Sequence, residues 1–370
     1  AKEEAFTYVG VARDDTLSLG MVVALSAVGF PAFGPDKAAA RIEASKVCSK
    51  DLMKKYGSPT AKYETFDDPE KVMDYIKAEG KYPVVIKADG LALGKGVLIC
   101  QNEQEAADGV KEIMLDKKFG ASGNHVVVEE FLTGPEVSVL SFCDGKTVKP
   151  MVSSMDHKRA LDHDEGLNTG GMGTVAPNPY YTPAVAERCM QEIFLPTVAA
   201  MQAEGCPFKG CLYFGLMLTP DGPKVIEYNC RFGDPETQVV LPLLESDLLT
   251  VMEATTNGTL DKTDVKFSDG AAACVILASG GYPLAYEKGK EITGLTAGQL
   301  DAADVTVYHA GTAIKDGSLV TNGGRVLGVT ATANTLPEAL KKAYAATESI
   351  HFDKLHKRSD IGARALAAMQ

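Results

Sequence analysis

Blocks of apolar residues alternate between helical and strand spacing along this chain, which indicates a mixed α and β protein. Residues 36–56 have a helical period that ends at Gly57, and a second helix is predicted from Pro69, behind the capping residue Asp68, to about Glu79. Further helices are predicted over residues 18–28, 101–115, 182–204 and 237–255, and from the capping box Thr335-Leu-Pro-Glu338 onward.

Strand signals are densest in the second quarter of the chain. Two hairpins are predicted, one over Thr133-Gly134-Pro135 and one over Pro220-Asp221-Gly222. The predicted strands cover residues 6–11, 83–88, 96–100, 125–132, 136–142, 211–219 and 223–229.

These elements divide the chain into five predicted parts. Residues 1–41 hold a strand, a helix and a strand fragment, which is too little to close a domain alone. Residues 42–66 are a helical connection, and two α+β subdomains follow at 67–136 and 137–267. Residues 268–370 contain short β-rich pieces with many glycines, and a helix closes this last part.

The composition of the chain argues against several classes of protein. The chain has 370 residues, with 37 Lys and Arg against 49 Asp and Glu, a net charge of −12 and 45% hydrophobic residues. This composition excludes a mostly disordered chain, and the acidic balance without a basic block argues against nucleic acid as a partner. The longest apolar run, residues 271–278, is far shorter than the roughly 20 residues of a membrane helix, so no membrane partner is expected.

The eight cysteines are scattered without a CxxC pair, and the six histidines are dispersed. Zinc and iron–sulfur sites need clustered ligands, so neither is expected. Reduced thiols and the lack of a basic and apolar leader predict a cytoplasmic protein, and we expect a monomer.

The segment Gly90-Leu-Ala-Leu-Gly94-Lys95-Gly96 is a candidate phosphate clamp. It is not a P-loop, because three residues separate its first two glycines and Gly96 replaces the Ser or Thr that would bind magnesium. Its backbone N–H groups and Lys95 would fold over a polyphosphate. Lys87 lies in an apolar strand, where an anion would offset the cost of burying its charge. A tight turn with two solvated lysines explains these residues equally well.

Two further clusters contain candidate ligand-binding carboxylates. Alternation places Glu129 and Glu130 on opposite faces of a strand, which suits an adenosine whose ribose hydroxyls meet a carboxylate, although a plain amphipathic edge strand fits as well. Glu227, Asn229 and Arg231 share one face of the strand ending near residue 229. Carboxylate and amide oxygens suit magnesium, and Arg231 could hold an anionic substrate; a purely structural row of polar side chains is the alternative.

The segment from Asp156 to Gly173 has four glycines among its last eight residues, with polar groups between them. Such a backbone can approach a ligand closely, and a solvated loop is the alternative interpretation. His157 has no second His or Cys at ligand spacing, so it is not expected to bind zinc.

Four motifs in one order carry a resemblance to a known family: VIKADGLALGKGV, VVVEEFLTGPEVSVL, DHKRALDHDEGLNTGGMGTVAP and VIEYNCRFGDPETQ. Together they resemble the phosphoribosylamine–glycine ligase family, and the likeness runs from about Phe33 to the end of the chain. The resemblance implies the ATP-grasp fold, an α/β and α+β architecture in which two α+β subdomains grip ATP. A truncated Rossmann-like remnant would precede them and a small β-rich domain would follow.

The resemblance also implies an activity and a set of site residues. The activity is ATP-dependent ligation of glycine to 5-phosphoribosylamine through glycyl phosphate, in de novo purine biosynthesis, with Mg²⁺ or Mn²⁺ as the metal. The residues implied at the nucleotide are Lys87, Gly94, Lys95, Gly96, Glu129, Glu130, Leu132 and Glu136, with Glu227 and Asn229 on the metal. Those implied in catalysis are Arg231, Lys95, Asp156 and Lys158, and those implied at the other substrates are Asp156, Lys158, Thr169, Gly170 and Arg231.

The sequence departs from the family at its start. Members begin with a Rossmann-like domain whose GxGGREH segment helps to hold the phosphoribosyl group, and no such segment occurs here. One alternative is therefore a truncated chain that binds ATP without catalysis. Another is a different ATP-grasp enzyme, such as a carboxylase subunit.

Overall fold

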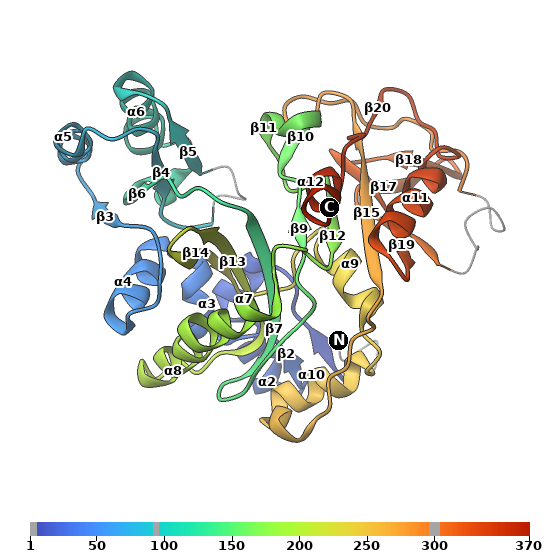
Figure 1. Ribbon diagram of the computed structural model, residues 1–370, viewed down its shortest axis with the longest axis horizontal. Helices are drawn as coiled ribbons and strands as arrows, with labels where there is room; N and C mark the ends of the chain where they lie inside the picture. Colours follow the sequence, from blue (N-terminus) through green and yellow to red (C-terminus); the bar gives the residue numbers. More distant parts are fainter. Residues whose placement is uncertain (1–5, 92–95, 296–303) are drawn as a thin grey trace. The chain divides into compact units, whose positions relative to one another are not determined.

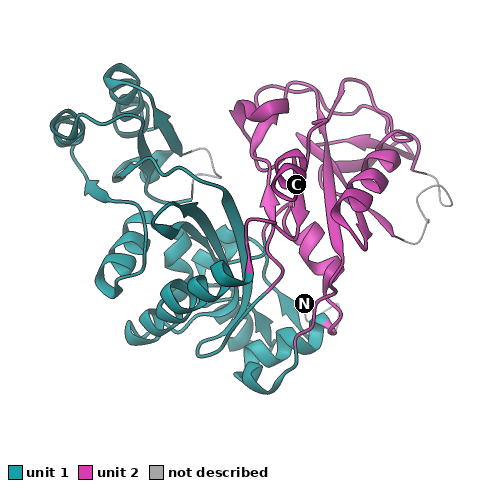
Figure 2. Cartoon of the chain, in the orientation of Figure 1, with its two compact units in different colours: residues 1–150, 183–232, 248–264 teal, residues 151–182, 233–247, 265–370 magenta. Residues whose placement is uncertain are grey.

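The computed structural model describes residues 6–91, 96–295 and 304–370, so the predicted ligands Gly94 and Lys95 lie outside the described residues. The chain forms two compact units (Figures 1 and 2). Unit 1 consists of residues 1–150, 183–232 and 248–264. Unit 2 consists of residues 151–182, 233–247 and 265–370.

The beginning of unit 1 has two short strands with helical structure between them, as the sequence predicts, but the single helix predicted over residues 18–28 is wrong because the structure has two helices there. Strand β1 (Val9–Gly10) pairs in parallel with β2 (Ala32–Phe33). Helices α1 (Asp14–Leu19) and α2 (Met21–Ala27) lie between them in the sequence. They are separate because Gly20 adopts a left-handed conformation with φ of 92°.

The single helix predicted over residues 36–56 is wrong, because the structure has two helices there. They are α3 (Lys37–Ala44) and α4 (Lys46–Tyr56). Ser45 between them is extended, and its hydroxyl accepts a hydrogen bond from the N–H of Cys48, which caps α4.

A four-stranded antiparallel sheet in unit 1 has the order β3–β6–β4–β5. Helices α5 and α6 cover one face of it with a core that includes Val72, Ile76, Ile86 and Val110. Because side chains alternate along a strand, the opposite face presents the side chains of Lys87 and Glu129. The elements are β3 (Tyr63–Phe66), α5 (Pro69–Glu79), β4 (Val84–Ala88), β5 (Val97–Cys100), α6 (Glu103–Val110) and β6 (Val126–Glu130).

A second four-stranded sheet in unit 1 has the order β14–β13–β7–β8. The hairpin of β13 and β14 confirms the prediction over residues 220–222. The predicted helix over 182–204 is confirmed too, with a π-helical turn at Met190–Phe194 between α7 and α8. The elements are β7 (Glu136–Asp144), β8 (Val148–Pro150), α7 (Pro183–Cys189), α8 (Leu195–Ala203), β13 (Lys209–Thr219), β14 (Gly222–Asn229) and α10 (Leu248–Asn257).

The hairpin predicted over Thr133-Gly134-Pro135 is wrong. Strand β6 pairs within the first sheet and β7 within the second, so these three residues belong to a connection between two sheets, residues 131–135. Gly134 has a φ of 147°, and a Cβ added to it would lie 2.1 Å from the carbonyl oxygen of Leu218. The glycine is needed because the connection passes against the backbone of β13.

Unit 2 is built on a six-stranded sheet whose main order is β16–β19–β15–β12–β9, with β20 also pairing with β15. Helix α11 packs on it through Leu336, Ala339, Leu340 and Ala343. The elements are β9 (Met155–Asp156), β10 (Arg159–Leu161), β11 (Glu165–Asn168), β12 (Gly173–Ala176), α9 (Thr237–Val240), β15 (Ala271–Ser279), β16 (Val305–His309), β17 (Thr312–Lys315), β18 (Ser318–Thr321), β19 (Arg325–Ala333), α11 (Leu336–Thr347), β20 (Leu355–His356) and α12 (Ala363–Ala368).

Two predictions about helices are corrected here. The single helix over residues 237–255 does not form: α9 gives way to a 3₁₀ turn at Leu241–Leu243, and Leu244 is extended. Thr335 precedes α11, but its hydroxyl donates to the Glu338 carboxylate instead of capping a backbone N–H.

Within the described ranges, no helix combines the length and apolar character that a bilayer crossing needs.

Candidate active site

Two buried lysines flank one buried carboxylate on the face of the small sheet in unit 1 that lies opposite α5 and α6. The Lys87 Nζ lies 3.1 Å from one oxygen of Glu129, and the Lys50 Nζ lies 3.0 Å from the other. All three side chains are at most 6% exposed, so this cluster holds a net buried charge of +1. An anionic ligand would balance that charge.

Lys50 was missed by the sequence reasoning. It lies on α4, and its Nζ also donates to the Thr60 hydroxyl at 2.7 Å. Burial lowers the pKa of Lys50 to about 8, while the neighbouring Glu129 opposes that shift. A lysine in a Lys-rich helix predicts a solvated side chain, so the sequence carries no signal for this position.

Lys87 also connects the small sheet to the strand that carries the predicted metal ligands. Its Nζ donates to the carbonyl oxygen of Ile226 at 3.1 Å. This carbonyl lies at a β-bulge, where Gly215 faces Glu227 and Leu216 faces Val225. Strand β4, which carries Lys87, and strand β14, which carries Glu227, are therefore in contact through this hydrogen bond, as the sequence predicts for a nucleotide site.

Glu227 and Asn229 have the alternation expected of metal ligands. Tyr228 between them points the other way, is buried, and its hydroxyl bonds to that of Thr197 at 2.9 Å. Among the described residues, no group of three or more His, Cys, Asp or Glu could hold a metal by itself. One carboxylate and one amide oxygen fit an ion such as magnesium, which takes its remaining ligands from phosphate and water.

Lys46 is a second basic residue that the sequence reasoning missed. It is the first residue of α4, and its Nζ donates to the carbonyl oxygen of Gly90 at 2.9 Å, at the base of the predicted phosphate clamp. Asp89 beside it accepts the N–H of Val47 at 3.2 Å. Burial lowers the pKa of Lys46, and the Glu227 charge opposes this shift. Lys46 therefore lies close enough to Glu227, on the strand with the predicted metal ligands, for the two charges to interact.

Arg231 is held by a buried glutamate, Glu43 of α3. One Glu43 oxygen accepts the N–H of Cys230 at 2.6 Å, and the other lies 3.5 Å from the Arg231 guanidinium. Arg231 also donates to the carbonyl oxygen of Phe232 at 3.2 Å. Burial raises the pKa of Glu43 to about 7, although the Arg231 charge opposes this.

The pKa of Glu43 predicts a pH-dependent stability. The folded state keeps the Glu43 proton up to about pH 7, whereas an exposed glutamate loses it near 4.5. The free energy of unfolding should therefore fall as pH rises across this interval, by about 3 kcal/mol from this group. Glu43→Gln should remove that decrease, as measured by urea unfolding at about pH 5 and about pH 8. The exposed Glu64→Gln is the matched control, and an unchanged pH dependence in Glu43→Gln would contradict the assignment.

The residues predicted at the adenosine also lie in unit 1. Glu129 is buried and Glu130 exposed, which confirms that the two side chains occupy opposite faces. Glu130 accepts the N–H of Lys62 at 2.9 Å. Leu132 follows β6, and Glu136 begins β7, where it faces Met217. Their roles at the nucleotide stay predictions.

Asp156 and Lys158, predicted at the glycine and amine substrates, lie in unit 2. Asp156 ends β9 and accepts the N–H of His157 at 2.7 Å. Desolvation and the neighbouring Glu236 raise the pKa of Asp156 well above its usual range, while Lys158 and Arg325 oppose this. Glu236 stands inside the quoted motif VIEYNCRFGDPETQ and Arg325 lies in the last part of the chain, but the sequence reasoning gave neither of them a role.

Thr169 and Gly170, the other two residues predicted at the substrates in unit 2, lie next to Lys158 and Arg325. The Thr169 hydroxyl donates to the Lys158 carbonyl oxygen and accepts the N–H of Gly171, both at 2.9 Å. Arg325 donates to the Gly170 carbonyl oxygen at 2.7 Å and pairs with Asp234 at 2.9 Å. Lys158, Thr169 and Gly170 are therefore neighbours in one loop, whereas Arg231 belongs to unit 1.

The two antiparallel sheets of unit 1, with basic side chains on one and the carboxylate and amide oxygens of Glu227 and Asn229 on the other, are the architecture of an ATP-grasp protein. A crystal structure of biotin carboxylase from Campylobacter jejuni in complex with β,γ-ATP supports this fold, with a TM-score of 0.76 at 14% identity over 96% of this chain and 78% of that one. The family model for the phosphoribosylglycinamide synthetase ATP-grasp (A) domain matches residues 44–237, and that for its C domain matches residues 272–364. The chain belongs to the phosphoribosylglycinamide synthetase family.

Individual relatives agree with this family. A phosphoribosylamine–glycine ligase from Vibrio vulnificus is 47% identical over all of this chain and 86% of its own length. One from Synechocystis is 47% identical over 98% of this chain and 85% of its own. The crystal structure of phosphoribosylamine–glycine ligase from Thermotoga maritima is 40% identical with a TM-score of 0.81, and the match covers 89% of this chain and 81% of that one.

Proposed function

We propose that this chain ligates glycine to 5-phosphoribosylamine with ATP, giving glycinamide ribonucleotide, ADP and phosphate in purine biosynthesis. The observation that carries this proposal is the contact of Lys87 with both Glu129 and the Ile226 carbonyl of the Glu227 strand, in a chain that matches the A and C domain models of the family. Relatives that share nearly its whole length are ligases of this name, which favours catalysis over a chain that only binds ATP.

The proposed roles follow from charge and position. Lys87, Lys46 and Lys95, with the backbone of Gly94 and Gly96, would neutralise and orient the phosphates. Glu227 and Asn229 would hold Mg²⁺ or Mn²⁺, which when bound supplies positive charge to the phosphate oxygens. The adenosine would contact Glu129, Glu130, Leu132 and Glu136. Glycine and the amine would contact Asp156, Lys158, Thr169, Gly170 and Arg231.

The proposed reaction has two steps. A glycine carboxylate oxygen forms a bond to the γ-phosphorus as the bond to the bridging oxygen breaks, so ADP leaves and glycyl phosphate forms. The amine of phosphoribosylamine then attacks the acyl carbon, phosphate leaves, and the nitrogen loses a proton. The positive side chains stabilise the transferring group, and exclusion of water protects the acyl phosphate from hydrolysis.

The test is ADP release by the full chain with glycine and freshly generated phosphoribosylamine. We expect ADP release that depends on both substrates, together with product detected by mass spectrometry. Equal ADP release with and without the amine would count against the ligase. Stabilisation by nucleotide without any product would indicate the non-catalytic alternative, and ATP hydrolysis that depends on bicarbonate would indicate a carboxylase.

The proposal extends to partners and location. We propose a cytoplasmic monomer that acts on small molecules and does not bind nucleic acid. The net charge of −12 and the eight free cysteines, seven of them buried, support this setting. Light scattering of the purified chain tests the monomer, which a dimer mass would contradict.

A further inference from the structure

The substrate segment of unit 2, residues 157–172, leaves the main sheet after β9 and returns at β12. Its middle is the hairpin of β10 and β11, which form a two-stranded sheet of their own. Leu161 and Leu167 in this hairpin are exposed, so it has little apolar packing of its own. An isolated two-stranded hairpin is marginally stable in water, so other contacts must hold this one.

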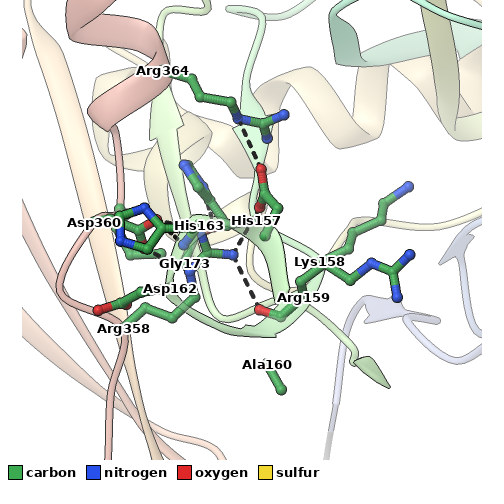
Figure 3. Close-up of polar contacts among 12 residues, drawn as sticks. His157, Lys158, Arg159, Ala160, Asp162, His163, Gly173, Arg358, Asp360 and Arg364 are labelled. Carbon is green, nitrogen blue, oxygen red and sulfur yellow. Dashed lines mark hydrogen bonds and ion pairs between the residues drawn. The ribbon is translucent and has the colours of Figure 1, made fainter. Parts of the chain in front are cut away.

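Arg358, from the chain between β20 and α12, supplies the central contact (Figure 3). Its side chain is only 1% exposed. The guanidinium donates to both oxygens of Asp360, at 2.8 and 2.9 Å, to Asp164 at 2.9 Å and to the carbonyl oxygen of Arg159 at 3.1 Å. The planar guanidinium fork suits such a set of acceptors, which the single ammonium of a lysine cannot reach at once.

The acceptors of Arg358 come from two different places. Asp360 belongs to its own segment, whereas Asp164 and Arg159 belong to the hairpin. Asp360 also accepts the N–H of His163 at 2.8 Å. Hydrogen bonds from Arg358 and His163 lower the pKa of Asp360 although its burial acts in the opposite direction, so this carboxylate is ionised at neutral pH.

Backbone contacts run beside this cluster. The Ser359 N–H donates to Asp162 at 2.8 Å. His157 lies between the carbonyl oxygen of Gly173 and the N–H of Gly362, each 3.0 Å from a ring nitrogen. The ring accepts from Gly362 and donates to Gly173, so it is neutral, in agreement with a pKa that burial lowers to about 4.

The hairpin needs such support because its turn is strained. His163 and Asp164 have φ values of 61° and 55°, in the left-handed region that residues with a side chain rarely adopt. Both residues are held in place by the Arg358–Asp360 pair. The Asp164 carboxylate also pairs with the guanidinium of Arg364 at 3.3 Å, and the Arg364 side chain is 51% exposed.

We propose that Arg358 is a positioning residue, which fixes the segment carrying Lys158 and Thr169 in the geometry that the glycine and amine substrates require. This inference rests on the proposed function. Arg358 would touch no substrate and would act through the hairpin. Its removal should therefore affect the substrates assigned to this loop and leave ATP affinity, which depends on Lys87 and Glu227 in unit 1, unchanged.

The test compares Arg358→Met and Arg358→Lys with Arg188→Met as the matched control, in the full chain. For Arg358→Met we expect the KM for glycine or for phosphoribosylamine to rise about tenfold or more, with the KM for ATP within about twofold of the wild type. Arg358→Lys should recover part of the loss, because it keeps the charge but not the fork. Arg188→Met should resemble the wild type, because Arg188 lies on α7 in unit 1, where it forms an exposed ion pair with Glu192.

Hydrogen exchange gives a second readout that is independent of activity. In Arg358→Met, the amides of residues 159–168 should exchange faster while those of β15 stay protected. If Arg358→Met fails to fold, Asp164→Asn removes one charged acceptor of the same cluster without changing its shape, and it should show the same split between KM values.

The outcomes separate the two proposals. A wild type without turnover of glycine and amine would refute the proposed ligase. A wild type that turns over, with Arg358 variants whose KM values for all substrates are unchanged or rise together, would overturn the positioning role and leave the ligase intact. Unaltered exchange of the hairpin in Arg358→Met would overturn it as well.

Discussion

Replacing Glu227 by Gln together with Asn229 by Ala should reduce ATP turnover by about 10³-fold or more. These side chains supply the carboxylate and amide oxygens that fit a metal on the phosphates, and no described cluster of acidic, His or Cys side chains offers a substitute. The fold should survive, because both side chains lie on the less buried face of β14 and the buried Tyr228 anchors the strand from its other face. Steady-state ADP release and urea unfolding measure the two effects.

The matched control for this prediction is Glu253→Gln with Asn257→Ala on α10, which makes the same chemical changes at exposed positions. It should keep wild-type turnover. A double variant at residues 227 and 229 that retained normal turnover would remove the metal assignment, and one that unfolded would show that the pair is structural. Titration with Mg²⁺ and with Mn²⁺ also reports which ion the wild type prefers.

Lys87→Met should lower kcat/KM for ATP by about 10²-fold, with a small effect on stability. The buried cluster of Lys87, Lys50 and Glu129 has a net charge of +1, and this variant brings it to zero. Glu129 keeps its ion pair with Lys50 at 3.0 Å, so no buried charge is left alone. The lost charge is the one that would balance a phosphate.

Glu129→Gln provides the contrast at the same site. It would leave two buried ammonium groups without their carboxylate, and breaking a buried pair in this way costs about 3–5 kcal/mol. Glu129→Gln should therefore lower the free energy of unfolding, as measured by urea unfolding, whereas Lys87→Met should mainly lower the catalytic rate. Equal destabilisation in the two variants would contradict the charge balance that we assign to this cluster.

The parts of the fold that the sequence predicts well are those set by local chemistry. Asp68 caps α5 through the N–H of Glu70, and Pro69 occupies its first turn, as the residue types indicate. Side chains two residues apart on a strand share a face, so the local sequence of β14 is enough to place Glu227 and Asn229 together. The lone lysine in an apolar strand, Lys87, points to a buried charge for the same reason.

Long-range pairing explains what the sequence could not predict. Lys46, Lys50 and Glu43 lie on helices whose polar residues are typical of solvent-exposed faces. Only the tertiary fold brings Lys46 to Gly90, Lys50 to Glu129 and Glu43 to Arg231. The turn signal of Thr133-Gly134-Pro135 is the same for a hairpin and for a connection between two sheets. Arg358 lies far along the chain from Asp164, so its role has no local signature.

The interleaved course of the chain has a consequence for biosynthesis. Strand β12 finds its neighbour β15 only about a hundred residues later, and unit 1 closes only when its last segment, residues 248–264, has been made. A nascent chain released early therefore exposes the unpaired edge of β12 in unit 2, and in unit 1 it exposes the apolar surface that Val251 and Ala254 of α10 cover in the complete chain. Exposed strand edges and apolar surfaces promote aggregation. Premature stop codons anywhere before β15 should thus yield insoluble fragments and no separately folding half, which would make this gene hard to split into two working pieces.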